Sequence, residues 1–187
     1  MRSTLLAAAL VLAAISPGQA ATLPGDGNWA GFAVDEFARG NLGWAAEDLS
    51  APLSFEVTIA AGQIGTLTVV DAGFSGDRFK VYDGTLLLGS TGAAVNGDST
   101  SGAPITFDYD AALANGDFSR GSFTLGAGSH VITGVLFAST IDPDFGALNS
   151  TIGGVKLTVS AVPEPATGAS LLIGLGLLLG ALRRRNA

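Results

Sequence analysis

Apolar and polar residues alternate through the middle of the chain. Phe55, Val57 and Ile59 are separated by polar residues, and the same period of two recurs at 66–70 and 78–82. A period of two places apolar side chains on one face of a β-strand. We therefore predict strands in these three segments. Further candidate strands lie at 85–90, 105–109, 121–125, 130–138 and 155–160.

Turn residues separate these candidate strands at hairpin spacing. Asp83-Gly84 stands between two apolar runs and predicts a two-residue hairpin, because both turn positions need positive φ. The segment 110–115 predicts a single helical turn with Asp110 as its N-cap. About eight short strands with little helix predict an all-β fold, with two antiparallel sheets packed as a β-sandwich or jelly roll. A barrel is the alternative architecture.

The N-terminal segment has the pattern of a secretory signal peptide at residues 1–20. Arg2 precedes an apolar run at 5–15, and the small residues Gly18 and Ala20 fit a signal peptidase site. An uncleaved anchor is the alternative, but eleven residues are too few to span about 30 Å of hydrocarbon. We expect cleavage between Ala20 and Ala21, which leaves a passenger at residues 21–161.

Three features follow one another at the C-terminus. They are the motif Pro163, Glu164 and Pro165, an uncharged apolar run at 166–182, and the basic cluster Arg183, Arg184 and Arg185. A helix over the apolar run reaches about 25 Å at 1.5 Å per residue, so it predicts a transmembrane helix. The arginines are expected to stay cytoplasmic, which places the passenger outside.

This C-terminal order resembles the PEP-CTERM sorting domain over residues 162–187. The resemblance implies that Pro163, Glu164 and Pro165 are the recognition motif of an exosortase, a membrane protease of bacteria that make exopolysaccharide. It also implies an inner-membrane anchored intermediate, followed by transfer to the cell surface or the extracellular space. The alternative is a plain membrane anchor in which the Pro-Glu-Pro segment is a stiff spacer.

The charge of the passenger limits the classes of molecule that it can bind. The whole chain has a formal net charge of −7, and the passenger carries five basic against fifteen acidic residues, a net charge of −10. Nucleic acid is excluded as a partner, because its binding needs Lys and Arg against the phosphates. The chain has no cysteine, so its apolar core must hold the fold together.

Two stretches of the passenger are similar to a class of secreted sandwich domains. They are residues 70–84 and 118–130, and the segment 81–84, Val-Tyr-Asp-Gly, is also similar to CUB domains. The cysteines of CUB domains are absent. The similarity implies a CUB-like β-sandwich passenger and says nothing of its ligand.

Candidate calcium ligands lie around the predicted hairpin. Asp71, Asp77 and Asp83 could supply carboxylate oxygens to Ca²⁺, which takes six to eight oxygen ligands. The alternative is that these aspartates serve the turns themselves. The segment 142–144 departs from a calcium loop, since neither its glycine nor its last acidic ligand is in place. No complete ligand set can be assembled, so we expect no cofactor.

Few residues in this sequence are candidates for a catalytic role. Gly97-Asp98-Ser99 looks like a nucleophile motif, and His130 is the single histidine that could act as its base. The segment before it is not a strand leading into a helix, and no aspartate stands three residues before His130. We therefore expect that the protein is not an enzyme, with a hydrolase as a remote alternative.

Aromatic residues cluster at the start of the passenger. Trp29, Phe32, Phe37 and Trp44 could form a platform that stacks on sugar rings, with Trp29 and Trp44 as the candidate glycan contacts. The alternative is that they fill the sandwich core. The sequence thus favours a non-enzymatic surface or extracellular-matrix protein associated with exopolysaccharide or biofilm, and a carbohydrate-binding, adhesive module is the alternative.

We predict that the exported protein begins at Ala21, because a short apolar run ends in a small-x-small site at this point. N-terminal sequencing of protein recovered from outside the inner membrane checks this. A chain that still begins at Met1 would contradict the signal peptide.

Overall fold

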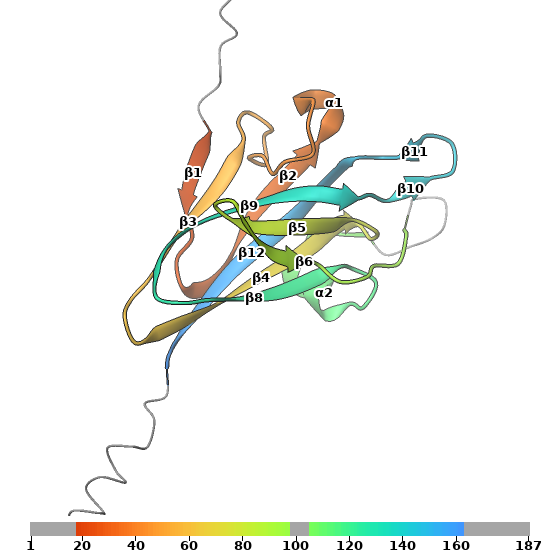
Figure 1. Ribbon diagram of the computed structural model, residues 1–187. Coiled ribbons are helices and arrows are strands. Elements are labelled where there is room, and N and C mark those ends of the chain that lie inside the picture. The colour runs from red at the N-terminus through yellow and green to blue at the C-terminus, as the bar shows by residue number, and fades with distance from the viewer. Residues whose placement is uncertain (1–17, 98–104, 163–187) are drawn as a thin grey trace, which may run out of the picture.

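The computed structural model describes residues 18–97 and 105–162, which form two large β-sheets packed face to face and one two-stranded sheet (Figure 1). The signal segment before residue 18, residues 98–104 and the tail from 163 lie outside the described residues. The predicted signal helix and transmembrane helix fall there. In the described part of the chain, the helices are too short to cross a bilayer.

The first sheet has the strand order β1-β3-β9-β5-β6. Its strands are β1 (Gln19–Thr22), β3 (Leu53–Ile59), β9 (Gly128–Ala138), β5 (Arg78–Asp83) and β6 (Leu86–Ser90). Neighbouring strands are antiparallel except for β1, which runs parallel to β3.

The second sheet is built around one long central strand. Strand β12 (Ser150–Ala161) lies between β2 (Asp26–Asp35) and β4 (Gln63–Phe74) and is antiparallel to both. The far side of β4 pairs with β8 (Arg120–Leu125) and β7 (Ile105–Thr106). The remaining elements are β10 (Ile141–Asp142), β11 (Gly146–Ala147), α1 (Glu36–Arg39) and α2 (Tyr109–Ala114).

The core lies between the two sheets. Phe55 of β3 and Phe79 of β5 meet Phe32 of β2 and Leu67 of β4, all nearly inaccessible to solvent. Trp44 comes from the connection between β2 and β3 and stacks on Phe32, with ring centroids 4.2 Å apart. Burial of these large side chains contributes the main favourable free energy of folding in a chain without cysteine.

The prediction of an all-β, sandwich-like fold is confirmed, because the described residues are mostly β-strand and pack as two facing sheets. The exception to the antiparallel expectation is β1, which pairs in parallel with β3 from Gln19↔Leu53 to Thr22↔Glu56. Strand β2 was not predicted from the sequence. Its sequence, DGNWAGFAVD, places glycine and alanine where the alternation of large apolar side chains would otherwise show.

The hairpin between β5 and β6 forms one residue later than predicted. Asp83 pairs with Leu86, so the two turn positions are Gly84 and Thr85 rather than Asp83 and Gly84. Gly84 has φ of 55°, which glycine adopts at little cost. The predicted antiparallel hairpin is therefore confirmed and its turn register was wrong: Asp83 is the last paired residue of β5, and its Oδ1 accepts the Val131 N–H at 3.1 Å.

The helical turn begins earlier than predicted. Asp108, not Asp110, is the N-cap of α2, and its Oδ1 accepts the N–H groups of Asp110 and Ala111 at 2.9 and 3.1 Å. Asp110 instead binds the indole N–H of Trp29 at 2.8 Å. Either aspartate has the chemistry of an N-cap, and the tertiary contact with Trp29 decides between them.

We predict that Gly134→Ala destabilises the fold by about 1–3 kcal/mol, since an added methyl group at this position would overlap with the indole ring of Trp44 in the core. Gly126→Ala is the matched control, because a methyl group there has no neighbour within 4 Å. Denaturant unfolding measures both. Equal midpoints for the two variants would show that Trp44 is free to move.

Candidate functional site

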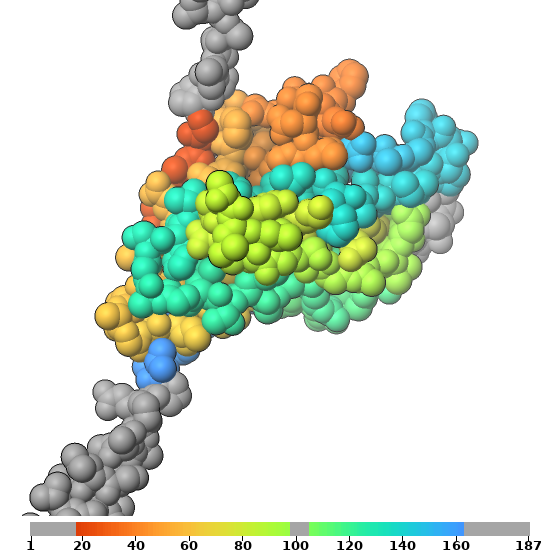
Figure 2. Space-filling model, viewed as in Figure 1, coloured from red at the N-terminus to blue at the C-terminus, as the bar shows by residue number. Residues whose placement is uncertain are grey.

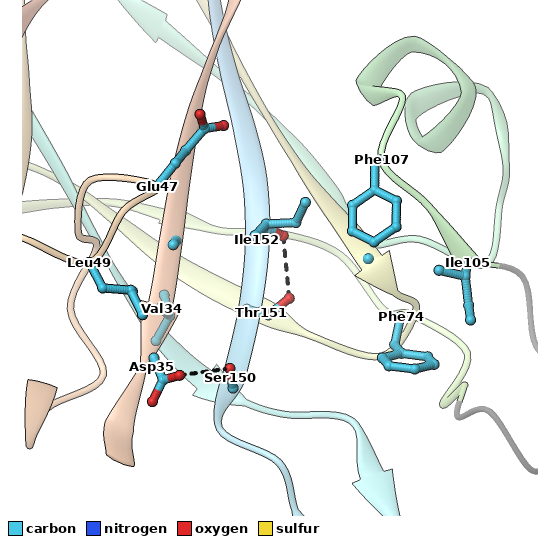
Figure 3. Close-up of a pocket in the computed structure, with 12 residues that line it drawn as sticks. Val34, Asp35, Glu47, Leu49, Phe74, Ile105, Phe107, Ser150, Thr151 and Ile152 are labelled. Carbon is cyan, nitrogen blue, oxygen red and sulfur yellow. Dashed lines mark hydrogen bonds between the residues drawn. The ribbon is translucent and has the colours of Figure 1, made fainter. Parts of the chain in front are cut away.

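A pocket of about 450 Å³ opens at one end of the second sheet (Figure 3). It lies where β2 and β4 end and β12 begins. Its volume is within the range of small-molecule sites, and its lining is mainly apolar with a few polar groups. This combination makes it the candidate binding site among the described residues.

The wall on the side of β4 and β7 is apolar. It consists of Phe74 at the end of β4, Ile105 of β7 and Phe107 just after β7 (Figure 3). Phe107 is 73% exposed and Ile105 is 48% exposed, although exposing apolar atoms to water is unfavourable. Exposed rings beside a hollow indicate a surface that contacts something else.

The opposite wall carries two carboxylates, Asp35 and Glu47 (Figure 3). Asp35 ends β2, and its two oxygens accept the Ala38 N–H at 2.8 Å and the Ser150 hydroxyl at 3.2 Å. Glu47 accepts the Tyr109 hydroxyl at 3.0 Å. Burial and this bond to Glu47 raise the pKa of Tyr109 to about 12, so the phenol stays protonated and donates. Since a carboxylate offers about four acceptor positions, both groups retain acceptor capacity.

Two residues beside the pocket have an unusual backbone conformation. Leu49 and Asn149 have φ of 60° and 50°, and within 18–97 and 105–162 they are the two non-glycine residues with positive φ. Asparagine tolerates this region, whereas for leucine it costs roughly 1–2 kcal/mol. The Arg39 guanidinium donates to the Leu49 carbonyl at 2.9 Å, which holds the strained residue in place. Backbone strain of this kind gathers at functional sites.

The aromatic residues predicted to form a sugar platform do not form one on the surface, because Phe32 and Trp44 stack on each other in the core. Trp44 is 3% exposed and Phe32 is fully buried, so both belong to the core, and Phe37 projects into solvent from α1. Trp29 is half-buried beside α2, with the Lys156 ammonium 4.3 Å above its ring. The structure therefore favours the core alternative for Trp44, which has no face available to a glycan in this fold.

The aspartates considered for calcium separate into two places. Asp71 and Asp77 are both buried and meet where the Asp77 N–H donates to Asp71 Oδ2 at 3.2 Å. Asp83 lies at the other end of β5, about 20 Å along an extended strand. In the described part of the chain no group of three or more acidic or histidine residues lies close enough to hold a metal ion.

The two buried aspartates serve the loops between strands. Asp77 accepts the Thr140 N–H at 2.9 Å and so joins β5 to the end of β9. Burial raises the pKa of Asp77, and burial together with the Asp77 charge raises the pKa of Asp71 well above its usual range. Asp142 serves a turn in the same way, since its Oδ1 accepts the N–H groups of Asp144 and Phe145 at 2.8 and 3.0 Å.

The single histidine pairs with an aspartate that sequence spacing did not indicate. His130 Nδ1 lies 2.7 Å from Asp83 Oδ2, and its Nε2 lies 3.0 Å from the Gly126 carbonyl oxygen. The bond to Asp83 raises the pKa of His130. Both ring nitrogens are therefore engaged in holding the turn before β9. Asp98 and Ser99, which belong to the considered nucleophile motif, lie outside the described residues.

The pocket residues had no prediction, because they come from segments far apart in the sequence. Asp35, Glu47, Phe74 and Phe107 belong to four different connections or strand ends. The sorting residues 163–165 and 183–185 lie outside the described residues. The expected cleavage point between Ala20 and Ala21 falls inside β1, and a chain beginning at Ala21 keeps the pairs Ala21↔Phe55 and Thr22↔Glu56.

We predict that Asp71→Asn stabilises the protein relative to wild type as the pH rises above about 4. The unfolded chain releases the Asp71 proton near pH 4, whereas the folded chain retains it to higher pH, so wild-type stability falls as the pH rises through this window. Asparagine removes the charge and still accepts a hydrogen bond from Asp77. Thermal unfolding from pH 4 to 8 checks this, with the exposed Asp144→Asn as control. Parallel pH profiles for wild type and Asp71→Asn would contradict it.

Comparison with known proteins identifies the C-terminal segment. None of the curated proteins matches the chain. The crystal structure of the pre-peptidase C-terminal domain of a Bacillus anthracis collagenase is similar with a TM-score of 0.41 and 8% identity, over 76% of this chain and 98% of that one. The model of the PEP-CTERM protein-sorting motif matches residues 161–185. The chain therefore carries a PEP-CTERM sorting motif, which implies an exported protein that is anchored in the membrane before exosortase processes it.

Proposed function

We propose that the protein is a non-enzymatic component of the cell surface or extracellular matrix, delivered by exosortase and associated with exopolysaccharide. The observation that carries this proposal is the PEP-CTERM sorting motif at residues 161–185, directly behind a folded β domain. A sorting signal in this position has a passenger to deliver, and the β-sandwich is that passenger.

The junction between passenger and tail supports a cut outside the folded domain. Strand β12 ends at Ala161, which pairs with Gln63, and the Val162 N–H donates to the Gly62 carbonyl at 2.8 Å. The backbone of the domain is thus hydrogen-bonded up to Val162. Pro163, Glu164 and Pro165 follow at once, and proline restrains the residue before it to an extended form that a protease can bind.

A structural rather than catalytic role accounts for three titratable groups that the sequence offered as candidates, His130, Asp71 and Asp77. His130 has both ring nitrogens engaged, and the Asp71 and Asp77 carboxylates are buried among loop backbone groups. A general base must reach a substrate proton within hydrogen-bond distance. These groups hold loops together instead, which supports the proposal that the passenger has no catalytic centre.

We predict that replacing Pro163, Glu164 and Pro165 with alanine leaves full-length protein in the inner membrane. The run at 166–182 and the three terminal arginines anchor the chain by default, because moving these charges across hydrocarbon is costly. A chain truncated after Val162 is expected to appear as soluble protein outside the inner membrane, with the fold's last backbone bond retained. Cell fractionation with immunoblotting measures both.

The control is a triple substitution of similar size that leaves the motif intact, with Gly62, Gln63 and Val162 also unchanged. Replacement of Pro143, Asp144 and Phe145 by alanine alters an exposed turn between β10 and β11 that lies outside the pocket lining. If the variant at 163–165 is processed and exported like wild type, the tail is a simple anchor and the proposed exosortase route is wrong.

A further inference from the structure

We infer that the pocket at the start of β12 binds a neutral sugar unit of a polysaccharide. The inference rests on the proposed association with exopolysaccharide and names the site and the class of ligand. The proposed contacts differ from the aromatic residues expected from the sequence. In the pocket, Phe107 and Phe74 face two carboxylates across β12 (Figure 3).

The apolar wall fits the less polar face of a sugar ring. The face of an aromatic ring is electron-rich and attracts the weakly positive C–H groups of a pyranose. Phe107 is 73% exposed and Ile105 is 48% exposed, so covering them removes apolar surface from water. Phe74 is half-buried below them and gives the wall a fixed base.

The opposite wall fits hydroxyl groups and disfavours anions. The ionisable groups that line the pocket are Asp35 and Glu47, both acidic. Carboxylates are hydrogen-bond acceptors, and sugar hydroxyls are donors. An anionic sugar would bring a like charge next to two carboxylates in a partly desolvated hollow, which is unfavourable. The charge of the pocket therefore selects a neutral sugar.

The polar groups are held in position before any ligand arrives. Asp35 is fixed by Ala38 and Ser150, and Glu47 is fixed by Tyr109. The strained Leu49 also lines the pocket, and the Arg39 guanidinium donates to its carbonyl. A preformed site loses less conformational freedom when it binds, and backbone strain at its rim is consistent with selection for binding rather than stability.

The place of the pocket on the domain suits a ligand outside the cell. The pocket contacts residues 150–152 at the start of β12, and the tail leaves from the other end of this strand after Ala161 (Figure 1). Nine residues of extended strand separate the two ends by about 30 Å. A pocket at this end faces away from the point of anchorage, where polysaccharide is accessible.

A competing surface lies on the first sheet, whose outer face is turned to the viewer in Figure 2. The Arg78 guanidinium and the Lys80 ammonium lie 4.9 and 5.6 Å from the ring centre of Phe137, which is 38% exposed. Two cations beside an exposed ring fit an anionic glycan. The two surfaces predict opposite ligand charges, so one experiment separates them.

The experiment measures binding of full-length protein, purified in mild detergent, to defined oligosaccharides by isothermal titration calorimetry. The probes are neutral hexasaccharides of glucose, mannose and galactose, and hexagalacturonate as the anionic probe. We expect binding to at least one neutral probe that changes little between 50 and 500 mM salt, because no ion pair forms. Phe107→Ala is expected to weaken it at least about tenfold, and Glu47→Gln several-fold.

Matched variants distinguish the pocket from general effects. Phe145→Ala removes a ring that is 85% exposed on the turn between β10 and β11, so it is expected to leave binding unchanged. Phe107 is also largely exposed, and equal melting temperatures of the two variants show that the fold is intact. If Phe107→Ala weakens binding only as much as Phe145→Ala, the assignment of the pocket is wrong.

Two further outcomes overturn the inference. One is binding of hexagalacturonate alone, lost in Lys80→Ala and retained in Phe107→Ala, which assigns recognition to the face of the first sheet. The other is no binding of any neutral probe. Neither outcome affects the proposed sorting route, because that is measured by fractionation of the variant at 163–165, in which the pocket residues are unchanged.

Discussion

The packing of Trp44 against Gly134 joins the two sheets, and the rest of the structure depends on it. The segment between β2 and β3 lies across the edge of the sandwich. The backbone N–H of Trp44 donates to the Gly134 carbonyl of the first sheet at 3.0 Å. The next residue, Ala45, exchanges two backbone hydrogen bonds with Ala33 of the second sheet. The indole ring enters the core above Gly134, where a side chain would leave it no room. Close packing of this kind tolerates little change in volume.

The position of the pocket follows from this junction. Glu47 and Leu49 are three and five residues beyond Trp44 in the same connection, so the anchored indole fixes where their side chains can lie. The strained conformation of Leu49 is stabilised by two hydrogen bonds of its own backbone. Its N–H donates to the Ala46 carbonyl, and its carbonyl accepts from the Arg39 guanidinium. The core therefore determines the geometry of one wall of the site, which is a reason for a rigid rather than an adaptable pocket.

Features that depend on a local sequence pattern could be predicted, whereas features that depend on long-range contacts could not. Strands such as β3 were predictable because Phe55, Val57 and Ile59 alternate within seven residues, and the sorting tail was recognisable because its features are contiguous. Trp44, Asp83 and the pocket residues were not, since their roles depend on partners far away in the chain. Trp44 requires a glycine ninety residues later, and Asp83 requires His130. No local period encodes such pairs.

Strand β12 connects the proposed binding pocket to the sorting motif. It is bonded on both sides, to β2 and to β4, over most of its length, so its two ends cannot shift independently. One end borders the pocket and the other leads into the sorting motif. Because ten consecutive residues of β12 pair with β4, a cut after Val162 would remove no strand of the domain. The proposed binding pocket and the sorting motif thus lie at opposite ends of one strand that is held on both sides.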